Sequence, residues 1–380
     1  MQYRKMEKLG FDVSIFGVGL MRLPTGEGGR SDIQYDKTTP LIHKMIDDGV
    51  NYIDTAYVYH DGFSEVSLGK ALAARPSDRA KIKIATKLPI RPNQGPEDWE
   101  KILDTSLERL NTDYIDFYLV HGSNYARIEP VKDELFKFLD DMKAKGKIKY
   151  PSASFHGDYE DFIKYVDAYD WQMLQVQFNL LDPYNQCTLK GIEYAGSKGI
   201  PIVVMEPLRG GVLVRHVPDV VKELYDNFPV KRTPLEWAFR YVYNRPEVKV
   251  ILSGIGTVEE LDQDVEIFSC SAANDMSEAE LKLVDDVRIA YESLAKIGCT
   301  GCRYCEPGCP VDIPISSILR GYDQACIMGS AAKFQSRYDQ LVKDKATAGS
   351  CIECGQCEGE CPQHLPIIEH LGFFRDNYEK

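Results

Sequence analysis

Four side chains of different chemical character stand at the ends of three short apolar segments of the 380-residue chain. Asp54 and Tyr59 follow the first segment, Lys87 ends the second, and His121 ends the third. Parallel strands of α/β folds present their chemistry at their C-terminal ends, so neighbouring strands would bring these side chains together. Each alone has an ordinary structural explanation, but together they predict one catalytic site.

The four residue types suit the protonation of a carbonyl oxygen. A tyrosine phenol has an ordinary pKa near ~10, and lowering it to about 7 requires roughly 4 kcal/mol in favour of the phenolate. One ammonium about 4 Å away supplies that much at an intermediate dielectric, so Lys87 beside Tyr59 is sufficient. Asp54 would keep Lys87 charged, and His121 would orient the carbonyl. This is the acid half of carbonyl reduction, for which a cofactor supplies the hydride.

The elements that would position these side chains alternate between β-rich and helical patterns from Phe16 to about Ile251. Such alternation predicts a parallel sheet, and eight strand candidates favour an α/β fold of the closed (β/α)8 TIM barrel type. An open doubly wound sheet is the alternative, but it usually carries a glycine fingerprint that is missing after Gly17 and Gly19. The strand candidates are 16–19, 52–54, 82–86, 115–119, 148–150, 174–177, 202–205 and 248–251.

Helix signals separate these strands and divide the chain into two domains. A capping box at Ser277–Glu280 opens a connector helix over 277–295. We predict a barrel domain at 1–295 that includes this connector, and a smaller, mainly helical domain at 296–380. Other helices are expected at 40–49, 98–110 and 135–145, where glycine or asparagine marks the C-terminal end.

The composition excludes several kinds of partner. A formal net charge of -13 argues against nucleic acid and against an anionic membrane surface. Residues 1–7 lack the apolar core of a signal peptide, and no stretch is long and apolar enough to span a bilayer. We expect a cytoplasmic protein.

Eight of the eleven cysteines form two identical runs near the C-terminus. Each run is C-x2-C-x2-C-x3-C followed by proline, the signature of ferredoxins that hold two clusters. Three closely spaced thiolates bind one cluster, and the fourth binds the other. This rule assigns Cys299, Cys302, Cys305 and Cys361 to one [4Fe–4S] cluster, and Cys351, Cys354, Cys357 and Cys309 to the second. Structural zinc is the alternative, but it needs only four ligands.

The residues between the two runs have a helical pattern. Segments 315–319 and 331–341 are helix candidates, and a further helix is expected from Ile367. This long link indicates a helical, metal-binding ferredoxin-type domain rather than a compact β-rich ferredoxin.

The first three-quarters of the chain resembles the aldo-keto reductase family. The resemblance rests on Asp54 with Tyr59 five residues later and on the segments 85–87, 114–121, 146–150 and 175–179. It implies a (β/α)8 barrel that reduces an aldehyde or ketone with NADP or NAD as cofactor. Tyr59 would be the proton donor, and the partner would be a small carbonyl substrate.

The same resemblance implies a nicotinamide site with two departures from the usual pattern. Gln175 matches the residue that holds the carboxamide, and Ser154 matches the serine beside it. Phe155 replaces an asparagine of the family, and Met205 replaces a tyrosine that stacks on the nicotinamide. A sulfur packs on a ring less specifically than a tyrosine does.

The phosphate end of the cofactor would meet the segment after the eighth strand. Gly254 and Gly256 let backbone N–H groups approach an anion at a helix start. Relatives that prefer NADP carry Lys or Arg there, but residues 253–266 contain neither, so Arg209 or Lys249 would have to substitute. The predicted cofactor-binding residues are Gly19, Met21, Ser154, Gln175, Met205, Leu208, Gly254, Gly256, Thr257 and Asp264.

Together the two domains predict an iron–sulfur oxidoreductase. A hydride carries two electrons and a cluster accepts one, so electron transfer between barrel and clusters would need a converter such as a flavin. No flavin motif is present, although barrels hold flavin phosphates without one. The clusters would otherwise exchange electrons with an electron-transfer protein. The alternative function is electron transfer or redox sensing on a barrel without reductase turnover.

Overall fold

The computed structural model describes the whole chain except His216, Ser271, Thr300, Cys302 and Lys380. It divides into two compact units. The first unit comprises Met1–Gly211 and Thr233–Glu278, and the second comprises Val212–Arg232 and Ala279–Lys380. The domain boundary near residue 296 stays a prediction, and each unit is described by itself below.

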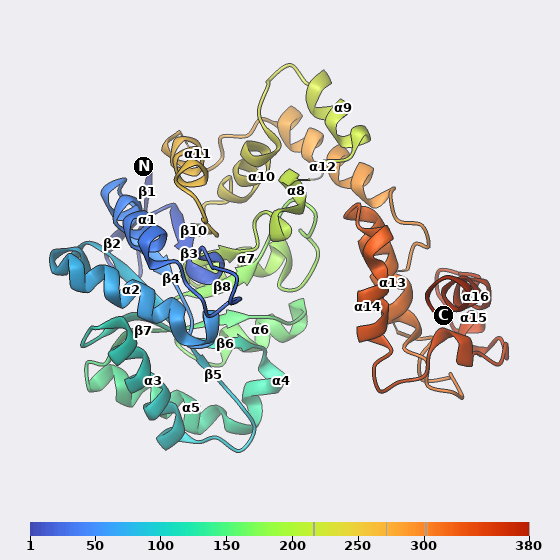
Figure 1. The fold of residues 1–380 in the computed structure, drawn as a ribbon, viewed down its shortest axis with the longest axis horizontal. Helices are drawn as coiled ribbons and strands as arrows, with labels where there is room; N and C mark the ends of the chain where they lie inside the picture. Colours follow the sequence, from blue (N-terminus) through green and yellow to red (C-terminus); the bar gives the residue numbers. More distant parts are fainter. Residues whose placement is uncertain (216, 271, 300, 302, 380) are drawn as a thin grey trace. The chain divides into compact units, whose positions relative to one another are not determined.

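Eight parallel strands of the first unit close into a barrel (Figure 1). They follow each other in sequence order, and the last strand pairs with the first. Each of the eight strand candidates coincides with one of these strands, apart from Ile82, which precedes β5. The predicted (β/α)8 fold is therefore confirmed, and the open sheet is excluded. The strands are β3 (Phe16–Gly19), β4 (Tyr52–Asp54), β5 (Lys83–Pro89), β6 (Ile115–Ser123), β7 (Ile148–Phe155), β8 (Leu174–Gln177), β9 (Ile202–Met205) and β10 (Val248–Ser253).

Helices surround the strands (Figure 1). The prediction that the first helix begins at Pro40 was wrong, because it begins at Tyr35 and contains Pro40. Asp36 favours the first turn by its charge, and Thr38 already lies on the buried face. The main helices are α1 (Tyr35–Asp47), α2 (Phe63–Ala74), α3 (Pro96–Leu110), α5 (Lys132–Ala144), α6 (Tyr159–Asp167), α7 (Thr188–Ser197), α10 (Pro234–Tyr243) and α11 (Val258–Ser269).

An antiparallel hairpin that the sequence patterns did not reveal fills the N-terminal end of the barrel. It consists of β1 (Tyr3–Met6) and β2 (Phe11–Ser14). Met6 and Val13 of the hairpin belong to one buried cluster with interior residues such as Phe117. Since this end is packed with apolar side chains, polar chemistry is confined to the opposite, C-terminal ends of the strands.

The second unit is mainly helical, as predicted. Its apolar core includes Ile318, Phe334 and Phe374, and three of the paired-motif cysteines lie in the same core. Its helices are α9 (Asp219–Asn227), α12 (Glu278–Glu292), α13 (Ile315–Ile327), α14 (Phe334–Leu341), α15 (Gln356–Gly359) and α16 (Ile367–Tyr378). Of the helices described in either unit, none combines the length and the apolar character that a membrane span requires.

Candidate active site and cluster sites

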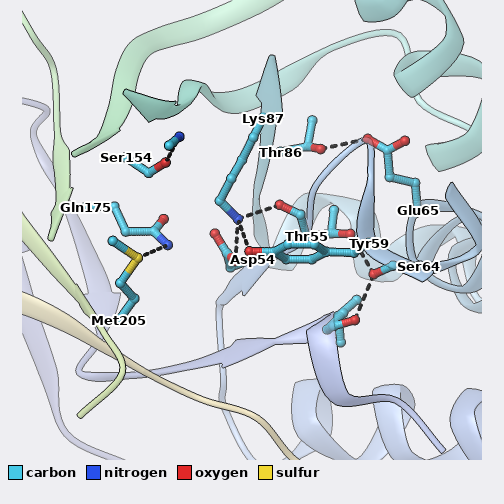
Figure 2. A network of polar contacts seen from close by, with 12 residues as sticks. Asp54, Thr55, Tyr59, Ser64, Glu65, Thr86, Lys87, Ser154, Gln175 and Met205 are labelled. Carbon is cyan, nitrogen blue, oxygen red and sulfur yellow. Dashed lines mark hydrogen bonds and ion pairs between the residues drawn. The ribbon is translucent and has the colours of Figure 1, made fainter. Parts of the chain in front are cut away.

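Lys87 is the centre of a buried polar group at the C-terminal ends of β4 and β5 (Figure 2). Its Nζ lies 2.6 Å from Asp54 Oδ1, 2.7 Å from the Thr55 carbonyl oxygen and 3.3 Å from the Tyr59 hydroxyl oxygen. An ammonium has three N–H donors, so each finds an acceptor. The side chain of Lys87 is only 1% exposed. The structure therefore brings together three of the four predicted residues through one cation.

The charge of this ammonium is stabilised by its neighbours. Burial alone would lower the pKa of Lys87, but Asp54 and Tyr59 outweigh burial and hold that pKa above its ordinary value. A buried ammonium without such partners would tend to lose its proton. Lys87 is thus a permanent positive charge at neutral pH.

The expected acidification of Tyr59 is not found in the structure. Burial raises the pKa of Tyr59, and the opposing effect of Lys87 does not fully offset it. The sequence argument counted the attraction of the ammonium but not the loss of water around the phenol, nor that the negative charge of Asp54 also raises the pKa of Tyr59. Tyr59 therefore remains protonated at neutral pH, which is the form that can donate a proton.

His121 completes the predicted group of four. Its ring lies edge-on to the ring of Tyr59, with centroids 6.0 Å apart. Burial, together with the charge of Lys87, lowers the pKa of His121 to about 3. A neutral imidazole keeps one ring N–H and one acceptor nitrogen. It can donate one hydrogen bond to an oxygen placed beside Tyr59 without adding a second positive charge.

The backbone directly after Tyr59 is strained. His60 and Asp61 have φ angles of 50° and 55°, in the left-handed region that non-glycine residues rarely adopt. Such residues cost on the order of 1–3 kcal/mol each and cluster at functional sites. The Nδ1 atom of His60 is hydrogen-bonded to the carbonyl oxygen of Arg30, which helps to hold this loop.

A second layer of polar contacts supports the site, and the sequence patterns did not reveal it. Thr55 Oγ1 lies 2.7 Å from Ser64 Oγ, which donates to the Leu20 carbonyl oxygen over 2.9 Å. Thr86 donates to the buried carboxylate of Glu65 over 2.6 Å (Figure 2). The available signal was the presence of Ser64 and Glu65 in α2, a helix whose other residues are mostly small or apolar.

The predicted nicotinamide residues are neighbours on adjacent strands. Ser154 of β7 pairs in register with Gln175 of β8. The Nε2 of Gln175 donates to the sulfur of Met205 over 3.7 Å, and its buried Oε1 has no hydrogen-bond partner among the described residues (Figure 2). A buried carbonyl oxygen without a donor is costly. A carboxamide N–H2 would satisfy it, so these residues fit a nicotinamide.

Phe155 contributes no polar contact to this site. Its ring packs edge-on against Phe162 and lies 5.4 Å from the ring of Tyr165. The position that carries an amide in the family is therefore part of the apolar packing between β7 and α6. A bound carboxamide would rely on Ser154 and Gln175.

The loop after β10 already binds a carboxylate. The backbone N–H of Gly256 donates to Glu260 Oε2 over 2.8 Å, and Thr257 caps α11 by accepting from the Glu260 N–H. An N–H expected to meet a cofactor phosphate is thus occupied by an acidic side chain. The carbon chain of Arg22 covers Gly254, where an added Cβ would lie 2.9 Å from Arg22 Cδ.

The remaining predicted cofactor residues differ in their surroundings. Asp264 of α11 is buried, and burial raises its pKa to about 7. Gly19 pairs in register with Asp54 at the strand ends. Met21 is 57% exposed, and Leu208 is partly exposed.

The two cations considered as substitutes for a phosphate-binding lysine are engaged elsewhere. Arg209 lies 3.4 Å from Asp182. Lys249 pairs with Glu7 over 3.1 Å, at the end of the barrel that the hairpin fills. Lys249 is therefore excluded as a phosphate ligand, because it lies near the start of β10 rather than at its end.

The cysteines of the second unit line two cavities in the grouping that the sequence predicts. Cys309 lines one cavity together with Cys351, Cys354 and Cys357. The other cavity is lined by Cys299, Cys305 and Cys361, whereas the fourth predicted ligand, Cys302, lies outside the described residues. The other lining side chains are mostly apolar, among them Ile313, Leu319 and Leu371.

The cysteine pattern, not the shape of the cavities, favours clusters over single metal ions. A zinc ion would need its sulfur ligands at about 2.3 Å from one point. In the part of the chain that the structure describes, no three potential ligands gather around one such point. Each run carries the C-x2-C-x2-C-x3-C-P spacing that is typical of [4Fe–4S] ligands.

Asp323 of α13 holds the segment that leads into the first cysteine run. Its two carboxylate oxygens accept hydrogen bonds from four successive backbone N–H groups, those of residues 296–299, with N···O distances of 2.7–2.9 Å. The sequence analysis missed this residue, because an acid inside a helix pattern gives no hint of the distant segment that it binds.

Comparison with known proteins finds one family match over most of the chain and a second near its C-terminus. Residues 16–287 match the aldo/keto reductase family, and residues 298–366 match a 4Fe-4S dicluster domain. The chain therefore belongs to the aldo/keto reductase family and is an oxidoreductase that carries an additional iron–sulfur domain.

Several known proteins are similar to the barrel part of the chain in sequence or in structure. An uncharacterized oxidoreductase, YqkF of Bacillus subtilis, is 27% identical over 74% of this chain and 95% of its own length. An NADH-specific methylglyoxal reductase of Escherichia coli is 27% identical over 53% of this chain and 65% of its own. The solved aldo-keto reductase AKR11C1 of Bacillus halodurans superposes with a TM-score of 0.63 at 23% identity, over 76% of this chain and 96% of its own. This last likeness concerns the fold.

Proposed function

We propose that the barrel reduces a small aldehyde or ketone to an alcohol with NAD(P)H, and that Tyr59 is the proton donor. The observation that carries the proposal is the position of Lys87, whose ammonium contacts Asp54 and the Tyr59 hydroxyl in one buried group. Family membership supports the same chemistry, because the family generally uses this cofactor on carbonyl compounds.

The side chains divide the work as follows. Neutral His121 donates a hydrogen bond to the carbonyl oxygen and orients it beside Tyr59. Tyr59 gives its proton to that oxygen as negative charge develops there. Lys87 stabilises the phenolate that remains, and its fixed charge needs no rearrangement during the reaction. A nicotinamide held by Ser154 and Gln175 would supply the hydride when bound.

The proposal extends to NADH as the preferred cofactor. The 2′-phosphate of NADPH would meet the segment 253–266, which itself contains no cation, although the side chain of Arg22, a cation from outside the segment, covers Gly254. Glu260 moreover places a carboxylate on the Gly256 N–H. A second negative charge at this point costs free energy, whereas the neutral 2′-hydroxyl of NADH does not.

For the second unit we propose two [4Fe–4S] clusters that transfer single electrons to or from a partner. The cysteine-lined cavities support this assignment, with Cys302 as the fourth ligand of its group. Iron and labile sulfide should each approach eight per chain, two clusters of four. Two zinc ions per chain with no labile sulfide would contradict the proposal.

A second candidate function is electron transfer or redox sensing without carbonyl reduction. The packing of Phe155 among aromatic rings favours it, since one carboxamide contact of the family is absent. The intact contact of Lys87 with Tyr59 favours reductase turnover instead.

Anaerobic oxidation of NADH and NADPH with a panel of small aldehydes and ketones distinguishes the two functions. Tyr59→Phe should lower kcat by about 100- to 10,000-fold, the range for loss of a general acid. Tyr194→Phe is the control, because its hydroxyl contacts Asp167 on the outer helices. Equally slow cofactor consumption by the wild type and Tyr59→Phe would favour the second function.

A further inference from the structure

A basic cavity lies between α13 and α14 of the second unit, apart from the cysteine-lined cavities. Its volume is about 430 Å³, within the range of small-molecule sites. Arg320, Lys333 and Arg337 surround it. Among the described residues that line it, none carries a carboxylate. In a chain with a formal net charge of -13, three cations around one hollow are a marked local excess.

The three cations are not neutralised by the protein. Within the described chain, none of them pairs with a carboxylate. The two acids nearest in sequence have other partners: Asp323 binds the backbone of residues 296–299, and Asp339 accepts from Gln335. The positive charge therefore faces the hollow and the solvent.

The floor of the cavity is apolar. Phe334 is buried there, and Ala325 and Leu341 line the same hollow. Gly321 keeps the floor open, because a Cβ at that position would lie 3.1 Å from Leu341 Cδ1. A bare inorganic anion would gain nothing from this surface, whereas the body of an organic molecule would be desolvated on it.

One helix joins this cavity to a predicted cluster site. Ser316 and Leu319 of α13 line the cavity of Cys299, Cys305 and Cys361, and Ser317 and Arg320 line the basic one. Arg320 also lies against the first cysteine run, since a Cβ on Gly301 would be 2.6 Å from its Nη1. An anion bound by Arg320 would thus lie about one helix diameter, roughly 10 Å, from that cluster site.

We propose that the cavity between α13 and α14 binds an organic phosphate of mononucleotide size, with the phosphate on Arg320, Lys333 and Arg337 and the ring or apolar body over Phe334. Concavity and volume favour a small molecule over the acidic surface of a partner protein, which would need a broad, exposed contact area. The proposal is independent of the reductase activity of the barrel.

The test uses the full chain with its clusters, prepared anaerobically, and measures binding of FMN, AMP and inorganic phosphate by calorimetry. We expect FMN or AMP to bind more tightly than phosphate, and added salt to weaken binding. Arg337→Glu should weaken it at least tenfold, about 1.4 kcal/mol. Lys343→Glu is the matched control, because Lys343 is exposed and does not line the cavity.

The possible results distinguish binding in this cavity from binding elsewhere in the protein. Nucleotide binding that Arg337→Glu leaves unchanged would place the ligand elsewhere, such as in the barrel, and would overturn the proposal. Equal affinity for inorganic phosphate would refute the role of the apolar floor. No binding by wild type up to about 1 mM would also overturn it. Tighter binding of FMN than of AMP would identify a flavin as the ligand. Tighter binding of AMP would identify an adenine nucleotide.

Discussion

The barrel and the second unit hold their candidate chemistry in opposite ways. In the barrel, Asp54, Lys87 and Tyr59 are charged or polar groups that satisfy one another through direct contacts. In the second unit, thiols such as Cys357 and Cys361 lie in an apolar core and line cavities. The contacts of the barrel site form within the protein itself, whereas in the second unit the proposed clusters would join the thiols.

Removal of iron should produce the largest difference between the two regions. With the clusters lost, the thiols around each cavity have nothing to bind, so the core that includes Phe374 should lose its packing. We expect hydrogen exchange in α13–α16 to rise toward unfolded rates while the barrel strands stay protected. Equal loss of protection in β4–β6 would contradict this separation.

Lys87→Met should be the most damaging single substitution in the barrel. It would leave the Asp54 carboxylate buried without its counter-ion, which typically costs about 3–5 kcal/mol of stability. Reductase activity should fall as well, because Tyr59 would lose its neighbouring charge. Denaturant unfolding of the barrel measures the effect.

Lys83→Met is the matched control for this substitution. Lys83 begins the same strand, β5, but lies over the ring of Phe11 at the opposite end of the barrel. We expect a loss well below that of Lys87→Met. Equal destabilisation by the two variants would show that the buried ion pair of Lys87 with Asp54 is not the main cause of the lost stability.

His121 should make the barrel sensitive to acid. The folded pKa of about 3 lies below the unfolded value near ~6.5, so the unfolded state binds the extra proton between these values. Stability due to this residue is therefore unaffected above pH ~6.5 and decreases as the pH falls, by about 2 kcal/mol at pH ~5. His121→Asn should unfold less readily on acidification. A pH profile identical to that of the wild type would refute the depressed pKa.

Glu260→Gln should have the smallest effect of this series. Loss of the carboxylate at the Gly256 N–H should shift the ratio of kcat/KM for NADPH and NADH toward NADPH by about tenfold or less. Glu259→Gln, an exposed neighbour without that contact, is the control. An equal shift in both variants would indicate general electrostatics rather than the specific contact.

The sequence alone determined those features that depend on local pattern. The apolar runs located all eight barrel strands, and strand ends located Asp54, Lys87 and His121, because side chains at the ends of parallel strands share one edge. The spacing of the cysteines predicted that Cys309 and Cys361 each lie with cysteines of the other run, as they do around the two cavities. In each case, the prediction followed from the alternation of apolar segments or from the spacing of residues along the chain.

Only the tertiary structure decided what depends on burial and on contacts between distant segments. Burial reversed the expected pKa shift of Tyr59, and Glu260 turned out to cover the Gly256 N–H. The support from Glu65 and the binding of residues 296–299 by Asp323 were equally hidden. Desolvation and long-range hydrogen bonds depend on which residues surround a group in space, and the order of residues along the chain does not state this.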